Sequence, residues 1–192
     1  MTETPIPIAF LDASVLYPAL LRNILMHLAL HGLFRAQWSA RVHEEWIAAL
    51  LRNRPDLDRP RLDRTRTLMD EHIPEALVQG YEHRIAALTL PDADDRHVLA
   101  AAIHCDASVI VTANLRDFPT TALAPHTIEA VHPDAFIAAL LEADPDAALA
   151  ALRQLRGSFK RPPKTVADLL ATMKKQDLTT SAGALAAFAE RI

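Results

Sequence analysis

The chain has 192 residues with a formal net charge of −4, and 51% of its residues are hydrophobic. This length allows one ordinary domain with an appendage, or two small domains, and the composition allows a sizeable core. The single cysteine, Cys105, excludes an intramolecular disulfide and a cysteine-based zinc site. The apolar runs are too short to span a bilayer, and "MTETPIPIAF" lacks the features of a signal peptide, so we expect a soluble cytoplasmic protein. The negative charge does not favour binding of nucleic acid through the overall field, although local basic patches can provide it.

The hydrophobic pattern predicts strands that alternate with helices over the first 131 residues or so. In chain order we expect strands at 6–11, 33–38, 86–90, 107–114 and 127–131, and helices at 18–32, 40–53, 60–72 and 92–103. Pro18 and Gly32 delimit the first helix, and Ser39 is a suitable N-cap for the second. The alternation indicates an α/β fold of three layers, with a mostly parallel central sheet between helices.

From Pro133 onward the pattern predicts only helices, at 133–142, 145–156, 165–175 and 181–191. "GSFKRPPK", residues 157–164, is the best candidate for an internal joint. We therefore expect an α-helical C-terminal extension on the α/β domain.

Acidic and polar residues recur where the predicted strands end. They are Asp12 after the first strand, Asp92, Asp94 and Asp95 after the segment 86–90, and Asn114 and Asp117 after 107–114, with Glu44 and Glu45 near the start of the helix over 40–53. The carboxyl ends of parallel strands meet at one edge of a sheet, where ligands bind. Carboxylates gathered in one cleft repel each other unless a cation neutralises them, and ligands that are all oxygen suit Mg²⁺ or Mn²⁺. Such ions support hydrolysis of phosphodiesters.

Several of these acids also have a structural interpretation. Asp92 followed by Asp95 resembles a capping box at a helix N-terminus, and both interpretations hold if Asp92 caps while Asp95 points into the cleft. Asp94 is expected in solvent, as is one of Glu44 and Glu45. His97 and His104 lie about two helical turns apart, too far to share one ion, so we expect structural roles for them.

The segments "FLDASVL", "SARVHEEWIAAL", "LPDADDRHVLAAAI" and "VIVTANLRDF" occur in this order. Together they resemble the PIN domain, the fold of VapC-type toxin ribonucleases in toxin–antitoxin pairs. The resemblance implies a PIN-like nuclease domain over residues 5–142, with a helical extension over 143–192. It implies Asp12, Glu45, Asp95 and Asp117 as catalytic acids, with Ser14, Thr112 and Asn114 as their polar neighbours. It also implies an RNA substrate, a homodimer and an antitoxin partner that inserts into the cleft.

We therefore expect a metal-dependent ribonuclease in which Asp12, Asp95 and Asp117 bind Mg²⁺ or Mn²⁺. Glu45 completes the ligand set or orients the attacking water, with Glu44 as its alternative and Asp92 as a further candidate. Arg116 is the candidate for contacting phosphate. The segment 51–66 holds six arginines and three aspartates, which form either local ion pairs or a face that contacts phosphate.

The alternative function is a catalytically silent PIN-like module that binds or regulates. The four occupied acidic positions argue against this alternative. A flap-type DNA nuclease is disfavoured because the four glycines are not clustered, and a haloacid-dehalogenase phosphatase because no Asp lies two residues after Asp12.

Overall fold

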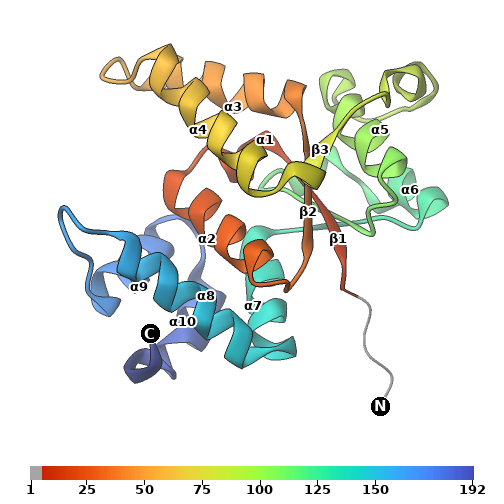
Figure 1. The fold of residues 1–192 in the computed structure, drawn as a ribbon. Coiled ribbons are helices and arrows are strands. Elements are labelled where there is room, and N and C mark those ends of the chain that lie inside the picture. The colour runs from red at the N-terminus through yellow and green to blue at the C-terminus, as the bar shows by residue number, and fades with distance from the viewer. Residues whose placement is uncertain (1–5) are drawn as a thin grey trace.

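Within residues 6–192, which the computed structural model describes, five strands form a single parallel sheet (Figure 1). The strand order is β3-β2-β1-β4-β5. The strands are β1 Ile8–Leu11, β2 Arg35–Ser39, β3 Leu77–Val78, β4 Val109–Val111 and β5 Glu129–Val131. The α/β fold expected from the sequence is confirmed. Residues 1–5 lie outside the described residues. They include the expected start of the domain at residue 5 and the first half of "MTETPIPIAF", the segment considered above as a signal peptide.

Helices cover both faces of this sheet. The α-helices are α1 Ala13–Leu16, α2 Ala19–Leu30, α3 Ala40–Asn53, α4 Arg59–His72, α5 Arg96–His104, α6 Thr120–Leu123, α7 Pro133–Ala143, α8 Pro145–Ser158, α9 Val166–Lys175 and α10 Thr179–Ala186. Short 3₁₀ helices are η1 Pro74–Ala76, η2 Glu82–Ala87, η3 Ala93–Asp95, η4 Leu115–Asp117, η5 Ala124–His126 and η6 Ala189–Arg191. Figure 1 shows α5 and α6 on one side of the sheet, and α2 with the C-terminal helices on the other. This is the three-layer arrangement that right-handed crossovers produce.

The strand order has a topological switch point between β1 and β4. The chain places β2 and then β3 on one side of β1, and afterwards returns to place β4 and β5 on the other side. In open α/β sheets, the crevice for ligands lies beyond the carboxyl ends of the two strands that flank this switch point. Those strands are β1 and β4, so the topology places the residues that follow them, Asp12 and Thr112, in the crevice.

The central strands are buried on both faces, as parallel sheets require. Phe10 and Leu11 of β1, and Ile110 and Val111 of β4, are all completely buried. This rigid centre fixes the positions of the residues directly after the strands.

Several helix boundaries follow local signals. Ser39 accepts a 3.2 Å hydrogen bond from the backbone N–H of Val42, and Asp58 caps α4 through a 2.9 Å bond from the N–H of Arg61. Gly32 has φ +79°, a left-handed conformation that favours glycine, and it follows the end of α2. The predicted first three helices are confirmed within a residue or two.

The prediction of a strand at 86–90 is wrong. Residues Glu82–Ala87 form η2 and an irregular loop follows, whereas the missed strand β3 pairs Leu77 and Val78 with Trp38 and Ser39. The edge beside β2 is therefore occupied by β3, and Leu90 is buried without joining the sheet. As a consequence, the acids at 92–95 follow a loop and enter the crevice at the start of α5.

The C-terminal helices are docked on the rest of the chain, with α8 packed against α2, and α10 against α7. Asp134 of α7 caps α10 across this contact. Its Oδ1 accepts bonds of 2.8 Å from the N–H and 2.7 Å from the hydroxyl of Ser181, and its Oδ2 accepts one of 2.9 Å from the N–H of Thr180. Burial alone would raise the pKa of Asp134, but these hydrogen bonds outweigh it and lower that pKa. In place of the helix expected over 181–191, α10 ends at Ala186 and η6 follows.

No helix among residues 6–192 has the length and apolar character needed to cross a membrane.

Candidate active site

Asp12 stands at the exit of β1 and is only 6% exposed. Its backbone N–H donates to the carbonyl of Val111 at 3.1 Å, which extends the pairing of β1 with β4 by one residue. Its Oδ1 then accepts a 2.7 Å bond from the N–H of Ala13, so Asp12 is also the N-cap of α1. The strand and the helix together fix the direction of this carboxylate.

Two hydroxyl groups hold the other oxygen of Asp12. Ser14 and Thr112 donate to Oδ2 at 2.6 and 2.9 Å. Ser14 Oγ in turn accepts a 3.1 Å bond from the N–H of Ala113, and Thr112 Oγ1 accepts a 3.0 Å bond from the N–H of Asn114. This network joins the turn after β1 to the turn after β4. Ser14 and Thr112 therefore occupy the supporting positions beside Asp12 that the sequence predicted.

A pocket of about 390 Å³ opens in front of Asp12. Its walls are Asp12, Ala13, Ser14, Tyr17, Glu45, Trp46, Ala49, Asp95 and Asn114. Three of the four predicted catalytic acids thus meet here, from the end of β1, the first turns of α3 and the start of α5. Tyr17, Trp46 and Ala49 provide the less polar wall, along α1 and α3.

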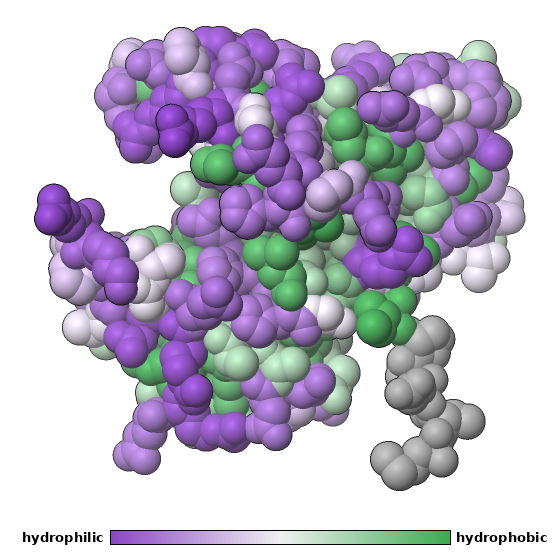
Figure 2. All heavy atoms as spheres, viewed as in Figure 1, coloured by the Kyte–Doolittle hydropathy of each residue, from purple (hydrophilic) through white to green (hydrophobic). Residues whose placement is uncertain are grey.

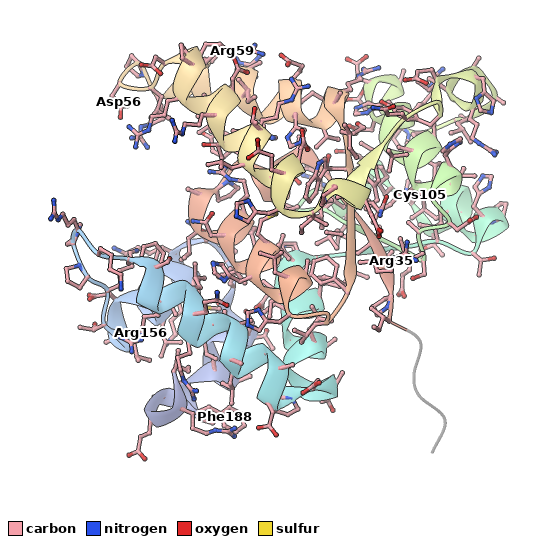
Figure 3. The ribbon with its side chains drawn as sticks, in the orientation of Figure 1. Arg35, Asp56, Arg59, Cys105, Arg156 and Phe188 are labelled. Carbon is pink, nitrogen blue, oxygen red and sulfur yellow. The ribbon has the colours of Figure 1, made fainter. Side chains whose placement is uncertain are left out.

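A larger hollow of about 640 Å³ lies along α4, and none of the predicted catalytic acids lines it. Its arginines Arg59 and Arg66 both contact Glu44 Oε1, at 2.8 and 2.9 Å. These two arginines therefore form local ion pairs, which is the first of the two alternatives given for the segment 51–66. Figure 3 shows Arg59 at the outer end of the α3–α4 pair, and Figure 2 shows that this end is covered mainly by hydrophilic side chains.

The pKa of Asp95 is raised by its surroundings in the pocket. Burial, followed by the charges of Asp12, Asp92 and Asp117, raises its pKa from 3.8 to about 6, and His97 acts in the opposite direction. These carboxylates are therefore close enough to repel each other, as expected for a site that attracts a cation.

The capping expectation for the acids at 92–95 needs correction. Asp92 is exposed and accepts a 2.8 Å bond from the N–H of Asp94, so it caps the 3₁₀ turn η3 and does not cap α5. Asp95 precedes α5 but makes no capping hydrogen bond with its side chain. The carboxylate of Asp95 is therefore available to the pocket, and the exposed Asp94 lies in solvent as predicted.

Glu45 and Glu44 have separate environments. Glu45 lines the pocket, and its Oε1 lies 3.3 Å from Arg41 Nε and 2.8 Å from His97 Nε2. Glu44 is exposed and contacts the two α4 arginines instead. Of the two alternatives, the structure therefore brings Glu45 to the other acids and leaves Glu44 outside.

Asp117 and Arg116 lie on η4, beyond the walls of the pocket. Asp117 is half-buried, and its charge contributes to the raised pKa of Asp95. Arg116 is exposed. Neither residue forms part of the pocket wall, and Asp117 is connected to the pocket through the effect of its charge on Asp95.

The donor set suits a hard cation that keeps part of its water. Among residues 6–192, no group of three or more Asp, Glu, His or Cys side chains is close enough to enclose a metal ion. Mg²⁺, however, is commonly held by only one or two carboxylates and retains several waters. Asp12 and Asp95 line one pocket and would supply the two carboxylates of such a site.

The sequence profile described as "PIN domain" matches residues 9–116. The chain belongs to the PIN-domain family. A second profile, described as "VapC50 C-terminal domain", matches residues 133–187. The chain is also 41% identical, over 101 residues, to a Mycobacterium tuberculosis protein named "Putative ribonuclease VapC50". That alignment covers 53% of this chain and 59% of the relative, so less than two thirds of the relative is spanned. No solved structure gives a significant match.

The sequence interpretation of this PIN domain missed two buried residues next to the pocket. His97, for which a structural role was expected, contacts Glu45, and nothing in the sequence indicated this contact. Arg22 of α2 donates a 2.5 Å bond to the carbonyl of Leu16, and its guanidinium lies 4.8 Å from the ring centre of Trp46. Burial lowers the pKa of Arg22 to about 10. The only sequence signal for His97 was its place in the first turn of the helix that follows Asp95.

Proposed function

We propose that the protein is a metal-dependent endoribonuclease that hydrolyses RNA phosphodiesters in the acidic pocket, and that it acts as the toxin of a toxin–antitoxin pair. The observation that carries this proposal is the meeting of Asp12, Glu45 and Asp95 in one pocket at the topological switch of the sheet, with the pKa of Asp95 raised to about 6. Membership of the PIN family and the name of the mycobacterial relative support it.

In this proposal Asp12 and Asp95 would hold Mg²⁺ or Mn²⁺ together with bound water, and Asp117, which lies on η4 outside the pocket wall, would reach the ion only through water. The bound ion would neutralise the carboxylates, activate water and stabilise charge on the phosphoryl oxygens. The hydrogen bonds from Ser14 and Thr112 keep Asp12 in one orientation, so that a ligand position is prepared before the ion arrives.

The remaining polar groups act on the water and the RNA. Glu45 orients the attacking water and accepts its proton, while Asn114 and Arg116 bind the phosphate. Water attacks phosphorus, the bond from phosphorus to the 3′ oxygen breaks, and that oxygen takes a proton from solvent water and leaves as a 3′-hydroxyl. The other product then has a 5′-phosphate.

We also propose that the chain consists of a nuclease unit and a helical extension. All pocket residues lie within the nuclease unit over residues 5–142, and the extension over 143–192 packs on α2 and α7. The VapC resemblance adds a homodimer, a cognate antitoxin protein and cytoplasmic location. Growth arrest on expression of the wild type, but not of Asp12→Asn, would support the toxin role.

The decisive experiment is cleavage of total bacterial RNA with Mn²⁺, comparing wild type with Asp12→Asn and mapping the ends of the products. We expect 5′-phosphate and 3′-hydroxyl ends from wild type, and loss of cleavage in the variant. Asp94→Asn, which removes an exposed acid from the same loop, is the matched control and retains cleavage. Products with 2′,3′-cyclic phosphates, or undiminished cleavage by Asp12→Asn, would contradict the proposal.

The alternative is a silent PIN-like binding module. It is distinguished by Mn²⁺ titration of Asp12→Asn and Asp95→Asn in the absence of RNA. If neither substitution weakens Mn²⁺ binding, the acidic pocket is not a metal site and the nuclease proposal loses its basis.

A further inference from the structure

His97 is the second residue of α5 and is 1% exposed. Its Nε2 lies 2.8 Å from Oε1 of Glu45, on α3. Arg41 approaches the same oxygen with its Nε at 3.3 Å. Arg41 and His97 thus contact the same oxygen of Glu45. Glu45 also lines the acidic pocket.

The imidazole of His97 has few other possibilities for polar contact. Among residues 6–192, neither ring nitrogen has an aligned hydrogen-bond partner. Nε2 of His97 nevertheless lies 2.8 Å from Oε1 of Glu45, which is the distance of a close polar contact. A buried polar group that lacks a partner is unfavourable, and Glu45 is the group within reach.

The contact also joins the two segments of the chain that supply pocket acids. Glu45 belongs to α3, whereas Asp95 immediately precedes α5. A second link runs beside it, because Arg41 Nη2 donates a 3.3 Å bond to the carbonyl of Asp94. Arg41 and His97 therefore connect the same two segments at the pocket, one from the exposed side and one from the buried side.

We propose that His97 is a positioning residue: together with Arg41 it holds Oε1 of Glu45, so that Oε2 faces the pocket, where the attacking water binds. This inference deepens the proposed function and rests on it for the role of Glu45. His97 acts through Glu45 and does not touch the RNA. Groups that support a catalytic carboxylate in this way contribute through orientation, so their loss affects turnover more than binding.

The kinetic test compares His97→Leu with His97→Gln. The amide nitrogen of glutamine reproduces the position of Nε2 and can donate to Glu45, whereas leucine fills the space without a polar group. We expect kcat of His97→Leu to fall about 10- to 100-fold, with KM changed by less than about threefold, and His97→Gln to recover most of kcat. His104→Leu and His104→Gln are matched controls, because His104 is an exposed residue at the other end of the same helix.

A second readout needs neither metal nor RNA. In ¹H–¹⁵N spectra of the histidine side chains of the metal-free protein, we expect the Nε2–H signal of His97 to be protected from exchange. It should shift in Glu45→Gln, whereas in Glu44→Gln it should stay in place. Thermal unfolding of every variant establishes that it is folded.

Equal kcat for wild type and a folded His97→Leu would overturn the proposal, as would a His97 signal that is indifferent to Glu45→Gln. Equally low kcat in folded His97→Leu and His97→Gln would also overturn it, since restoring the donor would then have no effect. If wild-type protein cleaves no RNA, the proposed function fails, and the spectra still decide whether His97 holds Glu45.

Discussion

Thr112 donates a 2.9 Å hydrogen bond to Oδ2 of Asp12 although 100 residues separate them in the chain. The bond joins the ends of β4 and β1, the two strands beside the switch point of the sheet. Thr112 is completely buried, and its hydroxyl also accepts from the N–H of Asn114. One side chain therefore links the first acid of the site to the turn that carries Asn114.

Thr112→Val keeps the shape of the side chain and removes the hydroxyl. We expect the free energy of unfolding to fall by about 1–3 kcal/mol, because a buried bond to a carboxylate is lost and the N–H of Asn114 loses its acceptor. Urea unfolding measures the change. Thr121→Val, at an exposed position of α6, is the control and should have little effect. An equal loss in both variants would show that the hydroxyl of Thr112 has no special contribution.

The adjacent residues Glu44 and Glu45 provide a matched pair of identical substitutions. We expect Glu45→Gln to lower kcat for RNA cleavage at least about tenfold, since Glu45 lines the pocket. Glu44→Gln should leave kcat unchanged and cost at most about 1 kcal/mol of stability, because its pairs with Arg59 and Arg66 are exposed. Steady-state cleavage assays measure both variants. The reverse order of effects would assign the role of Glu45 to Glu44.

Asp95 should make the metal-free protein less stable as the pH rises. Its pKa is raised to about 6, so the folded protein binds this proton more tightly than the unfolded chain does, and stability is lost as the pH rises through that value. Asp95→Asn removes the repulsion. We expect it to gain about 1–2 kcal/mol at pH 7.5, a figure reduced for the partial exposure of the side chain, and to gain nothing at about pH 4.

Denaturant unfolding with a chelator present, at both pH values, measures this difference. Asp94→Asn is the control, since Asp94 is exposed and outside the pocket. A gain of equal size at the two pH values would mean that the repulsion among the carboxylates is not its source.

Mn²⁺ should reverse the order of stability between wild type and Asp95→Asn at pH 7.5. A ligand that binds only the folded state stabilises it by an amount that grows with ligand concentration, about 2.7 kcal/mol at 100 times Kd. Thermal melts at increasing Mn²⁺ should therefore raise the Tm of wild type much more than that of the variant. Parallel increases in both proteins would place the metal elsewhere.

Asp134→Asn tests the attachment of α10. We expect a loss of about 1–3 kcal/mol at pH 7, because the carboxylate accepts three hydrogen bonds from Ser181 and Thr180. The pKa of Asp134 is lowered in the folded state, so its contribution is present above its ordinary value and is lost as the pH falls through the folded one. The difference from wild type should therefore shrink in acid.

Guanidinium unfolding at several pH values measures this effect. Asp144→Asn is the comparison, because Asp144 caps α8 locally with one 3.0 Å bond and asparagine caps equally well. A loss independent of pH would mean that packing around α10, and not the charge of Asp134, is responsible.

The sequence by itself determined the features that depend on neighbouring residues. Ser39 and Gly32 delimit helices through local hydrogen bonds and backbone conformation, and the apolar runs of β1 and β4 indicate strands buried on both faces. The order of the acidic motifs indicated the PIN family. Alternation of strands and helices likewise predicted a parallel sheet, with Asp12 at its carboxyl edge.

Only the tertiary structure decided how the site is assembled. Within residues 6–192, only one strand pairs with β2 on the side away from β1. That strand is residues 77–78 and not the longer apolar run 86–90, and no local pattern reveals this choice. Glu44 and Glu45 are the same residue type in succession, and the helix rotation of about 100° between them sends one to α4 and the other to the pocket. His97 meets Glu45 only because folding brings the start of α5 within reach of a side chain from the first turns of α3. Such contacts depend on residues distant in the chain, whereas helix caps and strand patterns depend on adjacent ones.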